Sequence, residues 1–275
     1  MNLSEANDTF TPDFRTFYHG VTALLACNLL VGLPANVYVV WHIAGGAGRT
    51  LASEIFAFSL AISEILFCIW SFYFMIHFLL GMPADVGTVV LECMSQFMFI
   101  SRPTFQSCIC VERYLAVVHP VVFLRLKPLR YRLAWCVVDW LLMLLYCVIP
   151  AFHLSTIHLS YALISKSLFF LVVMLYCGVR VLCVLKQPGP GDGDGDRESR
   201  NSIKRKAFKV IMITLVFTST TQFLQVFILG PTVLYASQQA VLQVTLVSLS
   251  INIVSVFITP LLYLHRVGKL PCIKF

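Results

Sequence analysis

The sequence is short of charged side chains. Only 12% of its 275 residues are Asp, Glu, Lys or Arg, whereas 59% are hydrophobic and 22 are Phe. Soluble domains carry about 25% charged residues. Because a chain with half that share cannot cover an apolar core with polar surface, the composition excludes an ordinary soluble domain and indicates a protein whose solvent is a lipid bilayer.

The sequence also lacks the short patterns of catalytic, metal and cofactor sites. It has no G-x-S-x-G, no phosphate-binding loop and no His/Glu spacing that would place two metal ligands on one helix face. The run D-G-D-G-D at 192–196 is like the start of a calcium loop, but Arg197 and Ile203 stand where that loop needs glycine and glutamate. We therefore expect no enzyme, no metal and no cofactor.

A disulfide framework is missing as well, although the chain has ten cysteines. Most of them fall within or at the ends of apolar segments, where cysteine commonly packs as a small residue. Cys93 lies near the outer end of the third segment, and the stretch at about 153–165 offers it no cysteine partner, so we predict no disulfide. Cys272 lies beside basic residues, where either a palmitoylated or a free thiol is consistent with the sequence.

What the sequence has in abundance is apolar segments long enough to cross a bilayer, which takes about 20 residues. There are seven, at roughly 17–41, 54–80, 87–117, 133–153, 160–186, 207–230 and 238–265. Ser, Thr, Cys, Gly and aromatic residues are mixed into them, as in helices that pack on one another in lipid. The sequence predicts an all-α membrane protein, a bundle of seven transmembrane helices over residues 17–265.

Lys and Arg predict the orientation of the bundle. They are concentrated after the first, third and fifth segments and in the tail, whereas the other side has little beyond Arg15 and Lys166. Positive residues favour the cytoplasmic side, so we expect residues 1–16 to be extracellular and the tail, 266–275, to be cytoplasmic. N-x-S/T sequons at Asn2 and Asn7 agree with this as candidate glycosylation sites.

The net charge of +7 then belongs to a cytoplasmic face near anionic lipid and does not indicate nucleic-acid binding. The basic loops could serve topology alone. The Gly- and Pro-rich stretch within 187–203 predicts a flexible third inner loop.

Several short motifs occur in order along these segments. Glu112, Arg113 and Tyr114 end the third, in C-V-E-R-Y. The others are Asn36 in G-L-P-A-N, Glu64 in L-A-I-S-E, Trp140 in the fourth segment, and Pro260 and Tyr263 in T-P-L-L-Y. Together they resemble the motifs of rhodopsin-like (class A) G-protein-coupled receptors. Residues 111–132 are most similar to the branch of nucleotide (purinergic) and hydroxycarboxylic-acid receptors.

The resemblance implies a heterotrimeric G protein as partner. It implies that Glu112 holds Arg113 at rest, that Tyr114 packs beside it, and that Arg113 faces the G protein's C-terminal helix in the active state. An arginine at the bilayer edge is costly unless it is paired. Holding it in one arrangement of the helices and releasing it in another can therefore shift the balance between the two. The alternative is a charge pair that only anchors the helix.

The segment that follows is the expected second inner loop. Val121 and Val122, flanked by Arg125 and Lys127, suit a docking knob for a partner helix. A short amphipathic helix on the membrane surface is the rival interpretation.

The chain also departs from the family. Thr88 stands where the family has a cysteine that bonds to the second outer loop. If Phe217 aligns with the family's phenylalanine, Thr220, Thr221 and Phe223 replace the C-W-x-P residues, so any hinge must arise elsewhere. The outer halves of the sixth and seventh segments hold no Lys, Arg or His, which argues against nucleotide binding. The ligand stays unknown, with an apolar ligand or none both open.

Arg102 is the most unusual residue. It lies eleven residues before Arg113, about 16 Å deeper into the membrane at 1.5 Å per residue. A charge at the bilayer centre costs about 3 kcal/mol on the gentlest scale and usually faces a partner. The resemblance places the site in a sodium pocket opposite the second-segment acid, Glu64. We therefore expect Arg102 and Glu64 to form a buried pair in which the guanidinium takes the place of sodium. The alternative is an arginine that meets only water and carbonyls.

We therefore interpret the chain as a receptor of the plasma membrane that can form dimers. A receptor-derived scaffold without signalling is the main alternative. A small transporter is the third, although the sequence shows no internal repeat.

Overall fold

The computed structural model describes residues 12–46, 54–80, 84–126, 128–148, 156–186, 213, 216–224, 226–227 and 237–266. Throughout these ranges the regular structure is helical. The elements are α2 (Pro12–Cys27), the π-helical η1 (Asn28–Gly32), α3 (Leu33–Ala44), α5 (Ile55–Leu79), α6 (Ala84–Val118), α7 (Pro120–Leu126), α8 (Leu129–Val148), α9 (Thr156–Lys186) and α12 (Gln238–Arg266). A further helical stretch covers 216–224.

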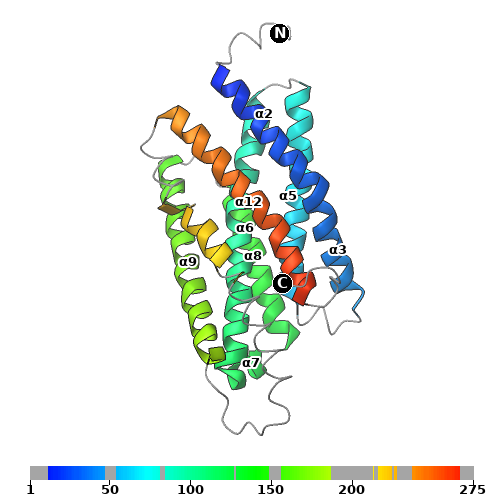
Figure 1. Cartoon of the computed structure of the whole chain (residues 1–275), viewed down its shortest axis with the longest axis vertical. Helices are drawn as coiled ribbons and strands as arrows, with labels where there is room; N and C mark the ends of the chain where they lie inside the picture. Colours follow the sequence, from blue (N-terminus) through cyan, green and yellow to red (C-terminus); the bar gives the residue numbers. More distant parts are fainter. Residues whose placement is uncertain are drawn as a thin grey trace.

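The long helices run side by side along the long axis of the molecule, and the start of α2 and α7 lie towards opposite ends (Figure 1). Four described helical segments are long and apolar enough to cross a membrane, at His19–Ala44, Ile55–His77, Ile164–Val184 and Leu242–His265. The helices α6 and α8 match predicted spans in position, but each carries charged residues that lower its mean hydropathy.

The first transmembrane rod is continuous from α2 through η1 to α3. Pro34 explains the π-helical turn, because proline has no N–H to donate to the carbonyl one turn earlier and its ring disturbs regular α geometry there. Asn36 makes a side-chain bond within the same rod, since its Nδ2 donates to the Gly32 carbonyl at 2.9 Å.

Gly32 lets this rod approach α12 closely. A Cβ added at Gly32 would lie 3.0 Å from Val256 Cγ1 and 2.6 Å from Asn28 Oδ1. Small residues at such contacts are how membrane helices pack tightly.

The helix α6 is central and packs against α5, α8 and α9. One apolar cluster joins α5, α6 and α8 through Leu60, Phe97, Ile100, Phe105 and Met143. A second joins α3, α5 and α12 through Val39, Ile43, Ala61 and Leu264. The neighbours against which α12 packs most closely are α2, η1 and α3.

Large apolar side chains cover much of the outside of the bundle. Trp41 is 68% exposed and Trp135 is 61% exposed. Such a surface is unsuited to water and fits contact with lipid tails.

Candidate functional site

A cavity of about 290 Å³ opens among the helices towards the end of the bundle at which α7 lies. Its lining comes from α3, α5, α6, α7, α9, the 216–224 stretch and α12, and it is mainly apolar. The polar and charged lining residues are Asn36, Glu54, Gln106, Glu112, Arg113, Thr218, Thr259 and Tyr263. The predicted residues Asn36, Glu112, Arg113, Pro260 and Tyr263 therefore line one cavity, although they come from three helices.

Arg113 is half-buried in this lining, near the end of α6. Its neighbour Glu112 forms an ion pair with Arg132 of α8, with 2.5 Å between Glu112 Oε1 and Arg132 Nη2. Arg132 is buried, and its guanidinium also lies over the Phe123 ring of α7, 5.4 Å from the ring centre. Glu112 and Arg132 thus tie α6, α7 and α8 together. The expected hold of Glu112 on Arg113 stays a prediction.

Tyr114 packs as a link between α6 and α9. Its hydroxyl lies 3.0 Å from His119 Nε2, and its ring lies 5.8 Å from that of Tyr176. His119 separates α6 from α7 but keeps the backbone hydrogen-bonded, because its N–H donates to the Leu115 carbonyl and its own carbonyl accepts from Phe123.

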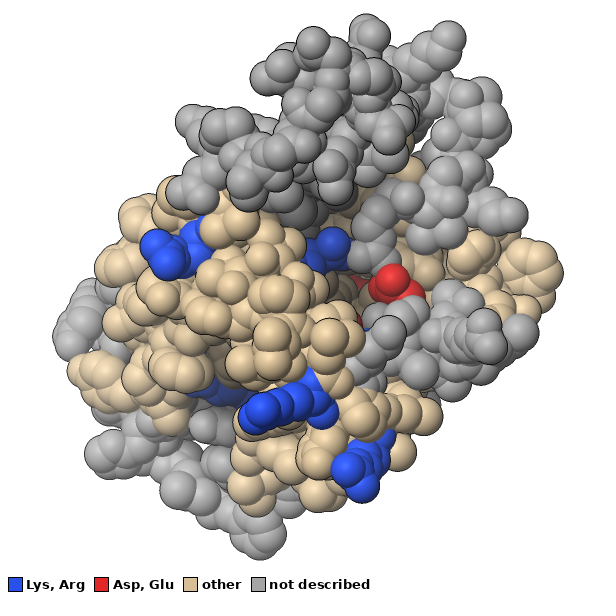
Figure 2. Space-filling view, turned by 90° about the horizontal axis from the view of Figure 1, so that it is seen from below, with Lys and Arg blue, Asp and Glu red and all other residues tan. Residues whose placement is uncertain are grey.

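The segment with Val121 and Val122 forms the helix α7, which fits both the docking knob and the membrane-surface helix of the sequence analysis. Val121 is 66% exposed and Leu124 is 62% exposed, whereas Phe123 turns into the cavity lining. The helix therefore presents an apolar surface beside the mouth of the cavity. Figure 2 shows basic side chains spread over this end of the molecule.

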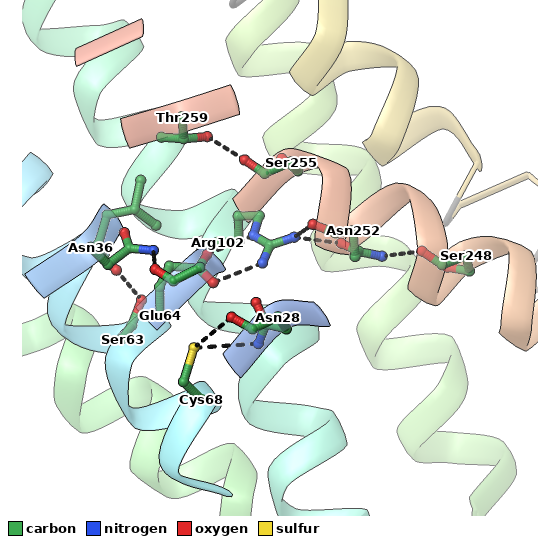
Figure 3. A network of polar contacts seen from close by, with 12 residues as sticks. Asn28, Asn36, Ser63, Glu64, Cys68, Arg102, Ser248, Asn252, Ser255 and Thr259 are labelled. Atoms are coloured by element: carbon green, nitrogen blue, oxygen red, sulfur yellow. Dashed lines mark hydrogen bonds and ion pairs between the residues drawn. The ribbon is translucent and has the colours of Figure 1, made fainter. Parts of the chain in front are cut away.

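A second polar cluster lies deeper in the bundle, around Arg102. Arg102 Nε donates to Glu64 Oε1 at 2.8 Å and Nη2 donates to Glu64 Oε2 at 2.9 Å. Nη1 donates to two oxygens of Asn252 on α12, the carbonyl at 2.8 Å and Oδ1 at 2.9 Å (Figure 3). Arg102 and Glu64 are only 3% and 6% exposed. The expected contact between Arg102 and Glu64 is present, and four of the guanidinium's hydrogen bonds go to protein oxygens.

Asn252 is the partner that the sequence analysis missed. The backbone carbonyl that Arg102 binds is that of Asn252 on α12. The available signal was a single asparagine in the apolar run S-L-S-I-N-I-V. Arg132 is a second missed residue, since the sequence presents it only as one of several basic loop residues.

The other predicted residues are placed as follows. Trp140 packs against Phe97 and Phe105, with ring centres 6.2 and 5.7 Å away. Phe217 is half-buried in the 216–224 stretch, and the Tyr263 ring lies 6.2 Å from that of His42. Asn2, Asn7 and Cys272 lie outside the described residues, and the side chain of Cys93 is not described either.

In the 216–224 stretch, which contains no proline, threonine hydroxyls donate to backbone carbonyls of the same helix. Thr220 Oγ1 donates to the Val216 carbonyl and Thr221 Oγ1 to the Thr218 carbonyl, both at 2.8 Å. Residues 226 and 227 are π-helical. Such back-bonding can bend a helix somewhat.

Residues 35–162 match the family described as 7 transmembrane receptor (rhodopsin family). The chain is 28% identical to proteinase-activated receptor 3 of Homo sapiens over 138 residues, 49% of this chain and 36% of that protein. It is 33% identical to C-C chemokine receptor type 8 of Homo sapiens over 123 residues, 43% of this chain and 34% of that protein. With a purinoceptor of Gallus gallus it shares 26% over 122 residues, 42% of this chain and 33% of that protein.

These matches show that residues 35–162 are similar to the rhodopsin-like, class A receptors, which are multi-pass membrane proteins. The relatives of the chain are receptors and not enzymes. The matched stretch spans only about a third of the length of these relatives, and the family match ends before the 216–224 stretch and α12. The relatives include a purinoceptor, but also chemokine and proteinase-activated receptors.

Proposed function

We propose that the chain is a G-protein-coupled receptor in which the cavity around Arg113 receives the C-terminal helix of a heterotrimeric G protein. Residues 1–16 lie outside the cell, the third inner loop covers about 187–203, and the tail at 266–275 is cytoplasmic. The end with α7 is then the cytoplasmic end. The Lys and Arg asymmetry of the sequence supports this orientation.

The observation that carries the proposal is the placement of Arg113. It is half-buried in the lining of a mainly apolar cavity, towards the end of the bundle that the proposal assigns to the cytoplasm. An amphipathic helix binds in such a groove through its apolar face, and an arginine in the wall can donate hydrogen bonds to the carbonyls that are unsatisfied at the end of a bound helix.

The helix α7 supports the same proposal from the rim. Val121 and Leu124 are exposed on it, and Phe123 connects it to the cavity. A partner that enters the cavity would cover this apolar surface, which is the kind of exposed patch that marks an interaction site. The ion pair between Glu112 and Arg132 holds α7 and α8 in place beside α6.

Recruitment of G-protein α subunits in transfected cells tests the proposal. A proximity signal between the full chain and at least one α-subunit family should exceed that of an unrelated seven-helix protein at equal surface level. Val121→Asp should reduce the signal because it places a charge in the interface, whereas Val121→Ala should retain most of it. Equal signals for both variants and the unrelated control would refute the proposal.

A non-signalling scaffold is the second candidate, and the sixth segment favours it. No proline occurs between 191 and 230, and the described part has its threonines bonded back to the helix. A protein that reaches the surface and dimerises but recruits no α subunit would match this candidate.

A further inference from the structure

Four oxygen atoms converge on one buried guanidinium. They are both carboxylate oxygens of Glu64 on α5 and the carbonyl and Oδ1 of Asn252 on α12, all at 2.8–2.9 Å from nitrogens of Arg102. Four of the five N–H groups of the guanidinium are used. We call this set of four oxygens the oxygen cage.

The cage is held in shape from outside. Asn252 Nδ2 donates to the Ser248 carbonyl at 2.8 Å, and this bond turns Oδ1 towards Arg102. Because this bond within α12 fixes the amide orientation, the position of the Asn252 oxygens is set by α12 itself. Figure 3 shows Asn252 between Ser248 and Arg102 on the α12 side and Glu64 on the other.

Arg102 and the cage also join two helices, α6 and α12, that make few close contacts with each other among the described residues. The helix α6 packs closely on α5, α8 and α9, whereas α12 packs on α2, η1 and α3. Of the two buried apolar clusters described above, one contains residues of α6 and the other contains a residue of α12. Neither cluster contains residues of both helices. The two bonds from Nη1 to Asn252 therefore connect α6 and α12 where apolar packing contributes little.

We propose that Arg102 is a tethered cation that occupies an oxygen cage between α5 and α12, and that its Nη1 bonds to Asn252 tie α12 to α6. Carboxylate and carbonyl oxygens are the ligands that hard cations prefer. The side chain supplies that cation permanently, so the cage has no room or charge for a free one. The two halves of the cage differ, because the Glu64 half balances the charge whereas the Asn252 half is neutral and can open without stranding a charge.

Cation rescue tests the cage directly and does not depend on signalling. Full-length protein in detergent is melted in NaCl and in choline chloride at equal ionic strength. The wild-type melting temperature should be the same in both salts. Arg102→Ala should melt roughly 10 °C lower, since one charge of a buried pair is stranded. Guanidinium ion at low millimolar concentration should restore part of that loss saturably, because it fits the space that the side chain vacates.

The double variant Arg102→Ala/Glu64→Ala is the matched control and should show no rescue by guanidinium. Rescue of the double variant, or no more response in Arg102→Ala than in the wild type, would overturn the cage. A wild type that sodium stabilises would overturn it equally.

The tie to α12 has its own test, which also decides the matter if Arg102→Ala fails to fold. Hydrogen–deuterium exchange of α12 peptides should be several-fold faster in Asn252→Ala than in the wild type. Ser250→Ala is the matched control on the same helix, since Ser250 Oγ donates back to the Leu246 carbonyl of α12 itself. Arg102→Lys should also speed exchange, because one ammonium nitrogen cannot span both halves of the cage. Exchange in Asn252→Ala that equals Ser250→Ala would overturn the tie.

Discussion

Replacing Arg102 and Glu64 singly and together measures how strongly the buried pair is coupled. Arg102→Leu leaves a carboxylate that is 6% exposed without its two charge-assisted hydrogen bonds. Glu64→Leu leaves the guanidinium with only the neutral oxygens of Asn252. Breaking a buried pair from one side costs about 3–5 kcal/mol, whereas replacing both partners by apolar groups is often neutral.

Whole proteins are stable by only about 5–15 kcal/mol, so each single substitution should sharply reduce surface expression. The double substitution to leucine should restore much of it, with a coupling free energy of about 3 kcal/mol or more in the double-mutant cycle. Surface antibody binding and the melting temperature of the solubilised protein give the two readouts. Arg180→Leu, at an exposed position of α9, is a matched control that should change little.

The reasoning fails if the double variant is expressed as poorly as the worse single variant. In that case the cost would arise from packing around the leucines and not from a stranded charge. It fails also if either single variant matches Arg180→Leu.

Three further predictions concern other parts of the chain. An antibody tag ahead of Asn2 should be detected on unpermeabilised cells; detection only after permeabilisation would reverse the topology. Ile203 precedes the basic run K-R-K at the start of the sixth segment, and we expect a carboxylate at this position to pair with Arg113. Ile203→Glu should then lower basal signalling by about five-fold at most, since one partly wet ion pair is worth about 1 kcal/mol or less; an unchanged basal signal would contradict this pairing. Gly32→Ala should lower the melting temperature, because its Cβ would meet Val256 at 3.0 Å and overpacking costs about 1–3 kcal/mol; an unchanged melting temperature would mean that α12 can shift freely at this contact.

The contact between Arg102 and Glu64 could be predicted from sequence because a charge in lipid requires a partner and few charges are available. Asn252 could not, since an asparagine in a membrane helix can satisfy itself on its own backbone, as its Nδ2 does with the Ser248 carbonyl. Only the three-dimensional placement of α12 shows that its other amide atom faces Arg102.

The contact between Glu112 and Arg132 could not be predicted from the sequence, and the reason is geometric. Consecutive residues on a helix point in directions about 100° apart and do not face each other, so Glu112 can reach α8 while Arg113 lines the cavity. The ion pair with Arg132 is a contact of Glu112 that the sequence did not predict, and the expected hold of Glu112 on Arg113 stays a prediction. Valines beside basic residues suit both a docking knob and a membrane-surface helix, and the helical form of α7 fits both roles.

Nucleotide exchange on purified G proteins tests the central claim most directly. The full chain in lipid nanodiscs should accelerate GTP loading of at least one heterotrimer above empty nanodiscs. Arg113→Ala should abolish this acceleration with an unchanged melting temperature, because the arginine lines the cavity that receives the partner. Acceleration that survives Arg113→Ala, or a wild type that accelerates none of the heterotrimer families, would contradict the account.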